Sequence, residues 1–482
     1  QVVTVTPSDV LPGRVDTAST FYCTVDSLGP YDCNTSINFT VHGENRGGQH
    51  TLTSTVSDYA GNVATTLGAT IYEDNLTQMP VLGRVTGPDE ATTNSIAIFD
   101  ETSASTSIAN MPNNFGLYDP SQSYLDLSSN RLFVADTTNN RVLVFRWDQT
   151  KNSPYSYKAI AVIGQPNFRR TNSGTNTMSS YGITFTPLNS PYGVAYDASS
   201  QQLFVADTGN NRVLRYDVST YYPKVPNAYF GQTSLALSGA NGGGGAGGST
   251  GFNAPAGLYV HPTSRSLYIA DISNCRIARL ANAYSAANTP TLTDQIGASG
   301  NAIGTITCPA AGAANNTLSN PIQVAFDLQN DKMYIADSGY NRVAVINSGS
   351  SATFASTYAK CIGQVGVGCN TSVAADSVTA LTSPLGVQIV GDAASTPYLA
   401  VSEGPNSGFN KIRFFDLTSN SAIATWNSGG SNLISSNLPA SDTSLNGPRL
   451  MFYEYSTQTL FVSDQKNHRV GIFTTSSMID DV

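Results

Sequence analysis

The sequence has few charged residues and no long apolar run. No stretch of its 482 residues is apolar enough to cross a bilayer, and no basic-then-apolar leader opens the chain at Gln1. Acidic residues outnumber Lys and Arg by 33 to 24, which gives a net charge of −9. Nucleic-acid binding, in contrast, needs a cationic surface. We expect no membrane-spanning segment and no nucleic-acid partner. We also expect that a signal peptide or a larger N-terminal region is missing before Gln1.

Sequence signatures of catalysis are missing as well. The chain contains no GxSxG or HExxH motif, and its glycine-rich stretch from Gly239 to Gly251 lacks the Lys-Ser/Thr pair of a phosphate-binding loop. Surface or structural roles are the simpler interpretation of the four histidines, which are His42, His50, His261 and His468. We predict no catalytic residue, no metal ligand and no cofactor, so the protein is not expected to be an enzyme.

The six cysteines include no CxxC pair and no Cys/His cluster of zinc-binding spacing. They fall into three pairs that are close in the sequence: Cys23 with Cys33, Cys275 with Cys308, and Cys361 with Cys369. Such pairs favour disulfides, and disulfides favour an extracellular, secreted protein. Five sequons would matter in a host that glycosylates, at Asn34, Asn38, Asn75, Asn315 and Asn370.

What the sequence does contain is a repeated unit. The stretch RLFVADTTNNRVLVF, Arg131 to Phe145, recurs five more times, and its fifth copy is degenerate. Each copy has an apolar run that ends in an acid, then a polar turn, then a basic residue that opens a second run, a pattern typical of two strands and a turn. The pairs are Asp136 with Arg141, Asp207 with Arg212, Asp271 with Arg276, Asp337 with Arg342, Glu403 with Lys411, and Asp464 with Arg469. Their recurrence favours a structural salt bridge over a ring of ligands.

The spacing of the units predicts the architecture. Successive basic residues lie 58 to 71 positions apart, which is room for a four-stranded sheet and a long loop. Six such units predict an all-β, six-bladed propeller. The last unit lacks its outer strand, whereas Val81 to Val85 repeats the pattern of that strand, so we expect the strand near 81–85 to close the ring.

With an Asp at the end of one strand and Asn-Arg at the start of the next, these units resemble NHL repeats. The resemblance implies a six-bladed propeller over residues 77–482, in which the Asp and Arg tie neighbouring strands and blades together. It also implies binding more often than catalysis.

Residues 1–76 carry no repeat and resemble a bacterial Ig-like β-sandwich module of surface proteins. The matching positions are Phe21, Cys23 and Asp26, then Cys33, then Gly48, His50 and Thr51, and finally Asp58, Gly61 and Asn62. The usual first strands are shortened here, so the sandwich is either incomplete or completed by other residues or by another chain.

The long loops of the repeats are expected on one face of the propeller, where loops of that length are usually functional. We predict an extracellular, cell-surface binding or structural protein with an adhesive role towards a protein or glycan ligand. One alternative is a self-assembling subunit of a surface filament or layer that binds neighbouring copies of itself. Another is a metal-dependent propeller hydrolase or lyase, although the expected innermost strands offer few inward acids.

Overall fold

The computed structural model describes most residues from Asn114 to Phe473, and only the backbone of strands β1 to β8 and β31 and of Thr474. Within that range the undescribed segments are 115, 156–157, 181, 220–221, 244–247, 299–302, 304–307, 309–315, 348–357, 364–368, 370–379, 392–396, 405–409, 418–421 and 428–444. The chain forms two compact units, one of residues 1–79 and 89–104 and one of residues 80–88 and 105–482.

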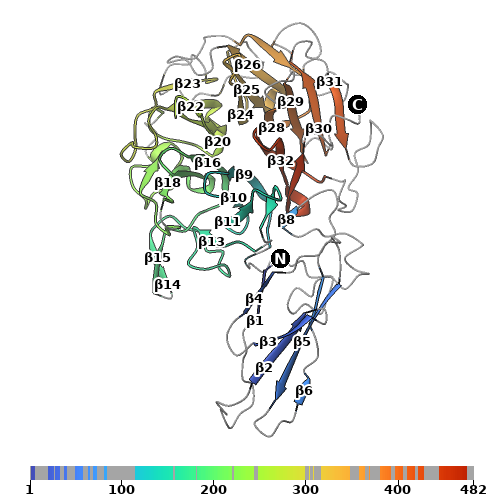
Figure 1. Ribbon diagram of the computed structural model, residues 1–482. Coiled ribbons are helices and arrows are strands. Elements are labelled where there is room, and N and C mark those ends of the chain that lie inside the picture. Colours follow the sequence, from blue (N-terminus) through green and yellow to red (C-terminus); the bar gives the residue numbers. More distant parts are fainter. Residues whose placement is uncertain are drawn as a thin grey trace. The chain divides into compact units, whose positions relative to one another are not determined.

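The larger unit is a six-bladed, all-β propeller, which confirms the fold predicted from the repeat (Figure 1). Each blade is an antiparallel sheet whose four main strands pair in sequence order, the last blade borrowing its outer strand. Blade 1 holds β9 (Pro120–Asp126), β10 (Arg131–Asp136), β11 (Arg141–Asp148) and β13 (Ala161–Ile163), with the short β12 (Ser153–Pro154) beside β11. Blade 2 holds β16 (Pro191–Asp197), β17 (Gln202–Asp207), β18 (Arg212–Asp217) and β19 (Ala228–Phe230).

The remaining blades repeat this order. Blade 3 holds β20 (Pro255–Val260), β21 (Leu267–Asp271), β22 (Arg276–Leu280) and β23 (Asp294–Ile296). Blade 4 holds β24 (Pro321–Asp327), β25 (Lys332–Asp337), β26 (Arg342–Asn347) and β27 (Lys360–Ile362). Blade 5 holds β28 (Pro384–Val390), β29 (Tyr398–Glu403), β30 (Lys411–Asp416) and β31 (Ala422–Asn427), and blade 6 holds β32 (Pro448–Glu454), β33 (Thr459–Asp464), β34 (Arg469–Thr474) and β8 (Val81–Gly83).

The ring closes in two ways. The innermost strands β9, β16, β20, β24, β28 and β32 contact one another in that order, and β32 contacts β9. On the outside of blade 6, β8 pairs antiparallel with β34, with Leu82 opposite Val470. A segment from the N-terminal side of the propeller therefore completes the last blade and covers its outer edge.

The hydrophobic core lies between the blades. Alternate side chains of a strand point to opposite sides of its sheet, so each blade has two apolar faces that a neighbouring blade can cover. Phe133 of blade 1, for example, packs with Val194 and Tyr196 of blade 2, all nearly inaccessible to solvent. Similar clusters fill the spaces between blades 2 and 3, 3 and 4, and 4 and 5. Leu132 and Phe461 belong to one cluster where blade 6 joins blade 1.

The smaller unit is also built of antiparallel strands. One sheet pairs β1 (Val2–Val5) with β4 (Ile37–Thr40). A second sheet has the order β3 (Leu28–Asp32), β2 (Thr20–Val25), β5 (Gln49–Ser57) and β6 (Val63–Thr65), and β7 (Ala69–Tyr72) also pairs with β5. The Ig-like module stays a prediction, because the side chains that would define its core, including those of Cys23 and Cys33, lie outside the described residues.

Truncation tests how the ring closes. Removal of residues 1–74 leaves β8 in place, whereas removal of residues 1–90 takes away the strand that pairs with β34. We expect the longer deletion to lower the melting temperature by at least several degrees more than the shorter one, because it exposes the edge and apolar face of blade 6. Differential scanning calorimetry of the two truncated proteins measures this. Equal melting temperatures would show that β8 contributes nothing to closure.

Candidate functional site

The two faces of the propeller are built differently. The turn after each acid lies against the end of the long loop that enters the same blade, as shown by the bonds from Gly209 N to Asn189 O (2.9 Å) and from Ser273 N to Asn253 O (3.1 Å). The side with these turns and long loops is called the loop face here. The opposite side, the hairpin face, carries connections such as the short turn between Asp197 and Gln202.

A buried acid sits at the end of the second strand of each blade, on the loop face. Asp207 Oδ1 accepts a hydrogen bond from Asn189 N (2.6 Å), and Asp207 Oδ2 accepts from Asn210 Nδ2 (2.9 Å) and Arg212 Nε (2.7 Å). The same Asp–Arg bond measures 2.6 Å for Asp136 and Arg141, 2.7 Å for Asp271 and Arg276, 2.7 Å for Asp337 and Arg342, and 2.8 Å for Asp464 and Arg469. These side chains are almost fully buried, so they act inside the structure.

The far ends of several of these arginines hold the long loops. Arg141 donates from Nη1 to Phe168 O (2.6 Å), just after blade 1, and from Nη2 to Gly116 O (2.8 Å), just before it. Arg212 donates from Nη1 both to Leu235 O (2.7 Å), after blade 2, and to Thr175 O (3.1 Å), within the loop before it. Each of these two guanidinium groups therefore holds a carbonyl in the segment that leaves its blade and one in the segment that enters it.

The degenerate fifth repeat uses a different cation. Glu403 Oε2 lies 2.5 Å from Arg413 Nε but 3.9 Å from Lys411 Nζ, the residue expected from the repeat. Arg413 is two positions further along β30 and therefore on the same side of the sheet as Lys411. The longer Glu side chain reaches it while still accepting from Thr382 N (2.6 Å). The sequence contains this signal as Lys-Ile-Arg, but alignment to the other repeats selects the lysine.

The residue before each of these cations links its blade to the next one. Asn140, Asn211 and Asn341 adopt a left-handed backbone conformation, with φ of 53° at Asn211. Their side-chain oxygens, like that of Asn410, accept from the loop before the next blade. The bonds run from Ser190 N to Asn140 (2.8 Å), from Ala254 N to Asn211 (2.7 Å), from Ser383 N to Asn341 (2.8 Å) and from Gly447 N to Asn410 (2.8 Å). Asn suits this position because it tolerates positive φ and carries a short acceptor.

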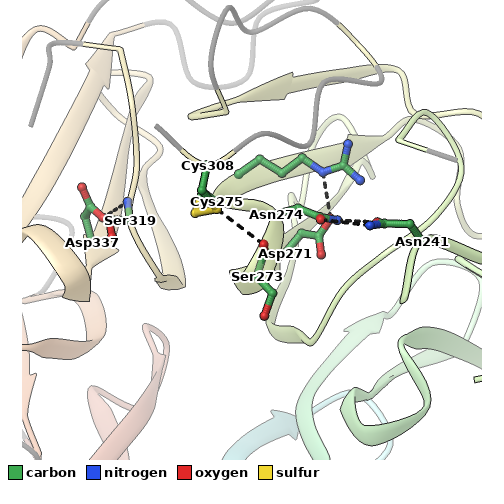
Figure 2. Close-up of a disulfide and its surroundings, with 9 residues drawn as sticks. Asn241, Asp271, Ser273, Asn274, Cys275, Cys308, Ser319 and Asp337 are labelled. Atoms are coloured by element: carbon green, nitrogen blue, oxygen red, sulfur yellow. Dashed lines mark hydrogen bonds and ion pairs between the residues drawn. A yellow bond between two sulfur atoms is a disulfide. The ribbon is translucent and has the colours of Figure 1, made fainter. Parts of the chain in front are cut away.

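Two blades depart from this rule. His468 of blade 6 takes the Asn position, and its Nδ1 accepts from Asp119 N (3.2 Å) before blade 1, so the imidazole replaces the amide at the closing joint. Cys275 of blade 3 also takes the position, with φ of 52°, and forms a disulfide with Cys308 in the loop towards blade 4 (Figure 2). A covalent bond thus holds that loop to the turn of blade 3. A second disulfide joins Cys361 of β27 to Cys369, which follows blade 4.

Burial and the hydrogen-bond partners shift the pKa values of these acids in opposite directions. Removal from water raises the pKa of Asp207, Asp271 and Asp464, although the facing arginine, the backbone amide and the Asn side chain each lower it. The pKa of Asp337 is raised to about 6. Asp337 has Tyr340 where the other repeats place the donating Asn, so one hydrogen bond to its carboxylate is missing.

The axis of the propeller is crossed by two glutamines. Gln122 of blade 1 accepts from Val194 N of blade 2 (3.2 Å) and Leu258 N of blade 3 (3.4 Å), and its Nε2 donates to Leu258 O (3.2 Å). Gln323 of blade 4 makes the equivalent bonds to Val387 N of blade 5 (3.0 Å) and Met451 of blade 6, with 3.2 Å to its N and 2.6 Å to its O.

Local backbone geometry makes room for these crossings. The pairing of the inner strands is irregular near the third residue, for example between Pro191 and Val194, and this frees backbone groups from the sheet. In the inner strands of blades 2 and 3 the third residue is Gly193 and Gly257, where a Cβ would come within 2.1 Å of Ala256 O and 2.3 Å of Ile322 O. Small residues therefore let the blades approach so closely that one amide side chain can bond two of them.

The described residues contain no group of three or more His, Cys, Asp or Glu placed to hold a metal ion. His261 directly follows the inner strand of blade 3. Its Nδ1 accepts from Thr263 N (3.3 Å) and Ser264 N (3.2 Å), and burial lowers its pKa. His42, the side chain of His50 and those of the five sequon asparagines lie outside the described residues.

In the part of the chain that the structure describes, no helix is both long and apolar enough to cross a membrane.

A family model for the NHL repeat matches residues 188–216, which span most of the first three strands of blade 2. No curated protein matches the chain. Among solved structures, an auxiliary nutrient binding protein from Bacteroides thetaiotaomicron is 12% identical with a TM-score of 0.47, over 96% of this chain and 91% of that one. One from Bacteroides ovatus is 11% identical with a TM-score of 0.45, over 94% and 90%. A gluconolactonase from Xanthomonas campestris is 12% identical with a TM-score of 0.38, over 74% and 86%. None of these similarities assigns an activity.

Replacement of a crossing glutamine tests its contribution. Gln323→Leu leaves the buried amides of Val387 and Met451 without their acceptor, so we expect the free energy of unfolding to fall by about 2–4 kcal/mol. Gln329→Leu is the matched control, because Gln329 is exposed on the hairpin face and should change the free energy by less than about 0.5 kcal/mol. Urea denaturation followed by fluorescence measures both. Similar small effects would mean that the crossing is dispensable.

The raised pKa of Asp337 predicts a pH-dependent effect of Tyr340→Asn. The folded carboxyl holds its proton more tightly than the unfolded one (3.8), so its contribution to the free energy of unfolding falls as the pH rises from 3.8 to about 6. A restored Asn donor stabilises the carboxylate, so relative to the parent the variant should gain about 1–2 kcal/mol more at about pH 7 than at about pH 4.

The lost packing of Tyr340 costs the same at both pH values and cancels in this comparison. Urea denaturation of both proteins at both pH values gives the four free energies. A difference between variant and parent that does not change with pH would contradict the assignment of the missing donor.

Proposed function

We propose that the protein is an extracellular, cell-surface binding or structural protein that attaches to a protein or glycan ligand through its loop face. The observation that carries this proposal is the clamping of loop bases by buried guanidinium groups such as those of Arg141 and Arg212. Loops held at both ends by a rigid scaffold present their exposed parts in a fixed arrangement, which is what recognition requires.

The loop between blades 1 and 2 illustrates this arrangement. Its return segment is part of the core, because Phe185 and Leu188 are fully buried. Its middle forms the hairpin of β14 (Met178–Ser180) and β15 (Ile183–Phe185), which projects from the propeller (Figure 1). Met178, opposite Phe185, is 43% exposed, and Ser179 and Gly182 nearer the tip are exposed as well. The base therefore serves folding, and the tip is available for contact.

The disulfides support the extracellular location. Both described bonds fasten segments of the loop face, Cys275 with Cys308 and Cys361 with Cys369. Disulfides persist where the surroundings are oxidising, and these two restrain the loops that the proposal assigns to binding.

Two features favour binding over the hydrolase or lyase alternative. The axis, where such propellers hold a metal ion, is crossed by Gln122 and Gln323, whose amides are engaged with backbone groups. The buried acids of the repeats are likewise engaged with arginines, as in Asp207 with Arg212. General acid–base work needs groups that can reach a substrate and exchange protons with it.

Shortening the projecting hairpin tests the proposal. Replacement of residues 176–184 by a short Gly-Ser linker removes the exposed tip but keeps Phe185 and Leu188 in the core. We expect an unchanged melting temperature and at least a tenfold weaker attachment to cells of the native source or to a panel of immobilised glycans and surface proteins. Biolayer interferometry and cell-binding assays measure this.

The matched control replaces Gln149 to Lys158, a connection of similar length on the hairpin face, and should attach like the parent. Attachment that survives the hairpin replacement but not the control replacement would overturn the assignment of the face. Loss of self-assembly alone, seen by light scattering while attachment persists, would favour the filament or layer subunit.

A further inference from the structure

The inner strands begin on the loop face, so their second residues surround the axis at that face. Three of these side chains, Ile322, Leu385 and Tyr192, belong to a small apolar cluster. It also contains Leu450, the third residue of β32, and Ile272, in the turn after β21. Ile322, Leu385 and Leu450 are buried, whereas Tyr192 and Ile272 are partly exposed. These five residues come from blades 6, 5, 4, 3 and 2, so the cluster spans the axis rather than a single joint between blades. Beside it stands one charged residue, Arg449, the second residue of β32.

Arg449 is held in place from two sides. Its Nε donates to Gln465 Oε1 of the same blade (2.6 Å), and its Cζ lies 5.1 Å from the centre of the Tyr192 ring, two blades away. These contacts fix the plane of the guanidinium. Within the described part of the chain its two η nitrogens make no hydrogen bond or ion pair, whereas Arg141 and Arg342 use theirs on loop carbonyls. Arg449 is only partly exposed, so its charge is incompletely hydrated.

The neighbouring acid does not occupy the guanidinium. Asp119 accepts from Thr138 Oγ1 (3.1 Å), and its backbone amide donates to His468 Nδ1 (3.2 Å). Its carboxylate attracts Arg449, but the two form no ion pair within 4.0 Å among the described residues. The guanidinium thus keeps a pair of parallel donors, the geometry that a carboxylate accepts in two hydrogen bonds.

We propose that Arg449 binds the carboxylate of a ligand whose adjoining group is apolar, as at the C-terminus of a peptide that ends in an aliphatic residue. The aliphatic side chain would lie against the partly exposed Tyr192 and Ile272, and the carboxylate would face the η nitrogens. An acidic sugar fits less well, because its hydroxyl groups would face apolar side chains without partners. The inference rests on the proposed binding function and names the chemistry of one ligand class.

The test uses N-acetyl-L-leucine as the probe, with N-acetyl-L-leucinamide to remove the charge and galacturonic acid to replace the apolar group. Ligand-observed NMR or calorimetry should show saturable binding of N-acetyl-L-leucine with a dissociation constant in the millimolar range. The amide should bind at least about tenfold more weakly, because the two charged hydrogen bonds are lost.

Arg449→Met should weaken binding of the carboxylate by about tenfold or more and leave weak binding of the amide unchanged. Arg146→Met is the matched control, because Arg146 also lies over a tyrosine, 4.8 Å from the Tyr155 ring, but on an exposed outer position of blade 1. Unchanged binding is expected there. Circular dichroism of both variants confirms that they are folded.

Three results would overturn the inference: no saturable binding at millimolar concentrations, equal binding of acid and amide, or an Arg449→Met variant that binds like the parent. Preferential binding of galacturonic acid would also overturn it, in favour of a glycan. The hairpin experiment is independent of this site, so attachment lost with the hairpin but insensitive to Arg449→Met would reject this inference alone.

Discussion

The buried bond between an aspartate and an arginine is the constraint on which the propeller depends. Asp207 and Arg212 are removed from water, and their attraction by itself offsets little more than the cost of that removal. Their value lies in what else they bond, since the carboxylate also orders Asn189 N and the guanidinium also holds Thr175 and Leu235. If either partner is removed, the other is left as an unpaired buried charge and two loops lose their anchors. The repeat therefore specifies where loops begin more than it adds stability.

The links between blades divide the ring into two halves of three blades. Gln122 bonds blades 2 and 3 from blade 1, and Gln323 bonds blades 5 and 6 from blade 4. The interblade Asn is replaced at the two joints between these halves, by Cys275 after blade 3 and by His468 after blade 6. One joint is reinforced by a disulfide and the other by an imidazole together with β8, which comes from another part of the chain. The two joints that lack the interblade Asn are thus the ones held by a disulfide or by His468 together with β8.

Sequence reasoning predicted the repeated unit and missed several contacts that leave no signal in it. The recurrence of pairs such as Asp136 with Arg141 was enough for six blades, because one unit gives two strands and the spacing leaves room for two more. The role of Arg413 was missed because alignment of the repeats places Lys411 at the cation position. It takes no account of the longer side chain of Glu403, which reaches Arg413. The roles of Gln122 and Gln323 leave no signal in the local sequence, because the partners of each lie on two other blades. Their hydrogen bonds also depend on irregular strand pairing and on glycines where blades approach closely. The long loops were expected to serve function, yet Phe185 and Leu188 of one such loop also belong to the core.

The hydrogen-bond partners of an arginine distinguish a structural role from a role in ligand binding. A guanidinium whose nitrogens all bond the protein, such as Arg141, contributes order but offers nothing to a ligand. Arg449 has the opposite balance, because Gln465 and Tyr192 fix its orientation and leave its outer nitrogens unbonded within the described residues. A donor that is fixed before binding loses little entropy when a ligand arrives. The same type of side chain therefore serves the scaffold in the repeats and recognition at the axis, and its hydrogen-bond partners determine which.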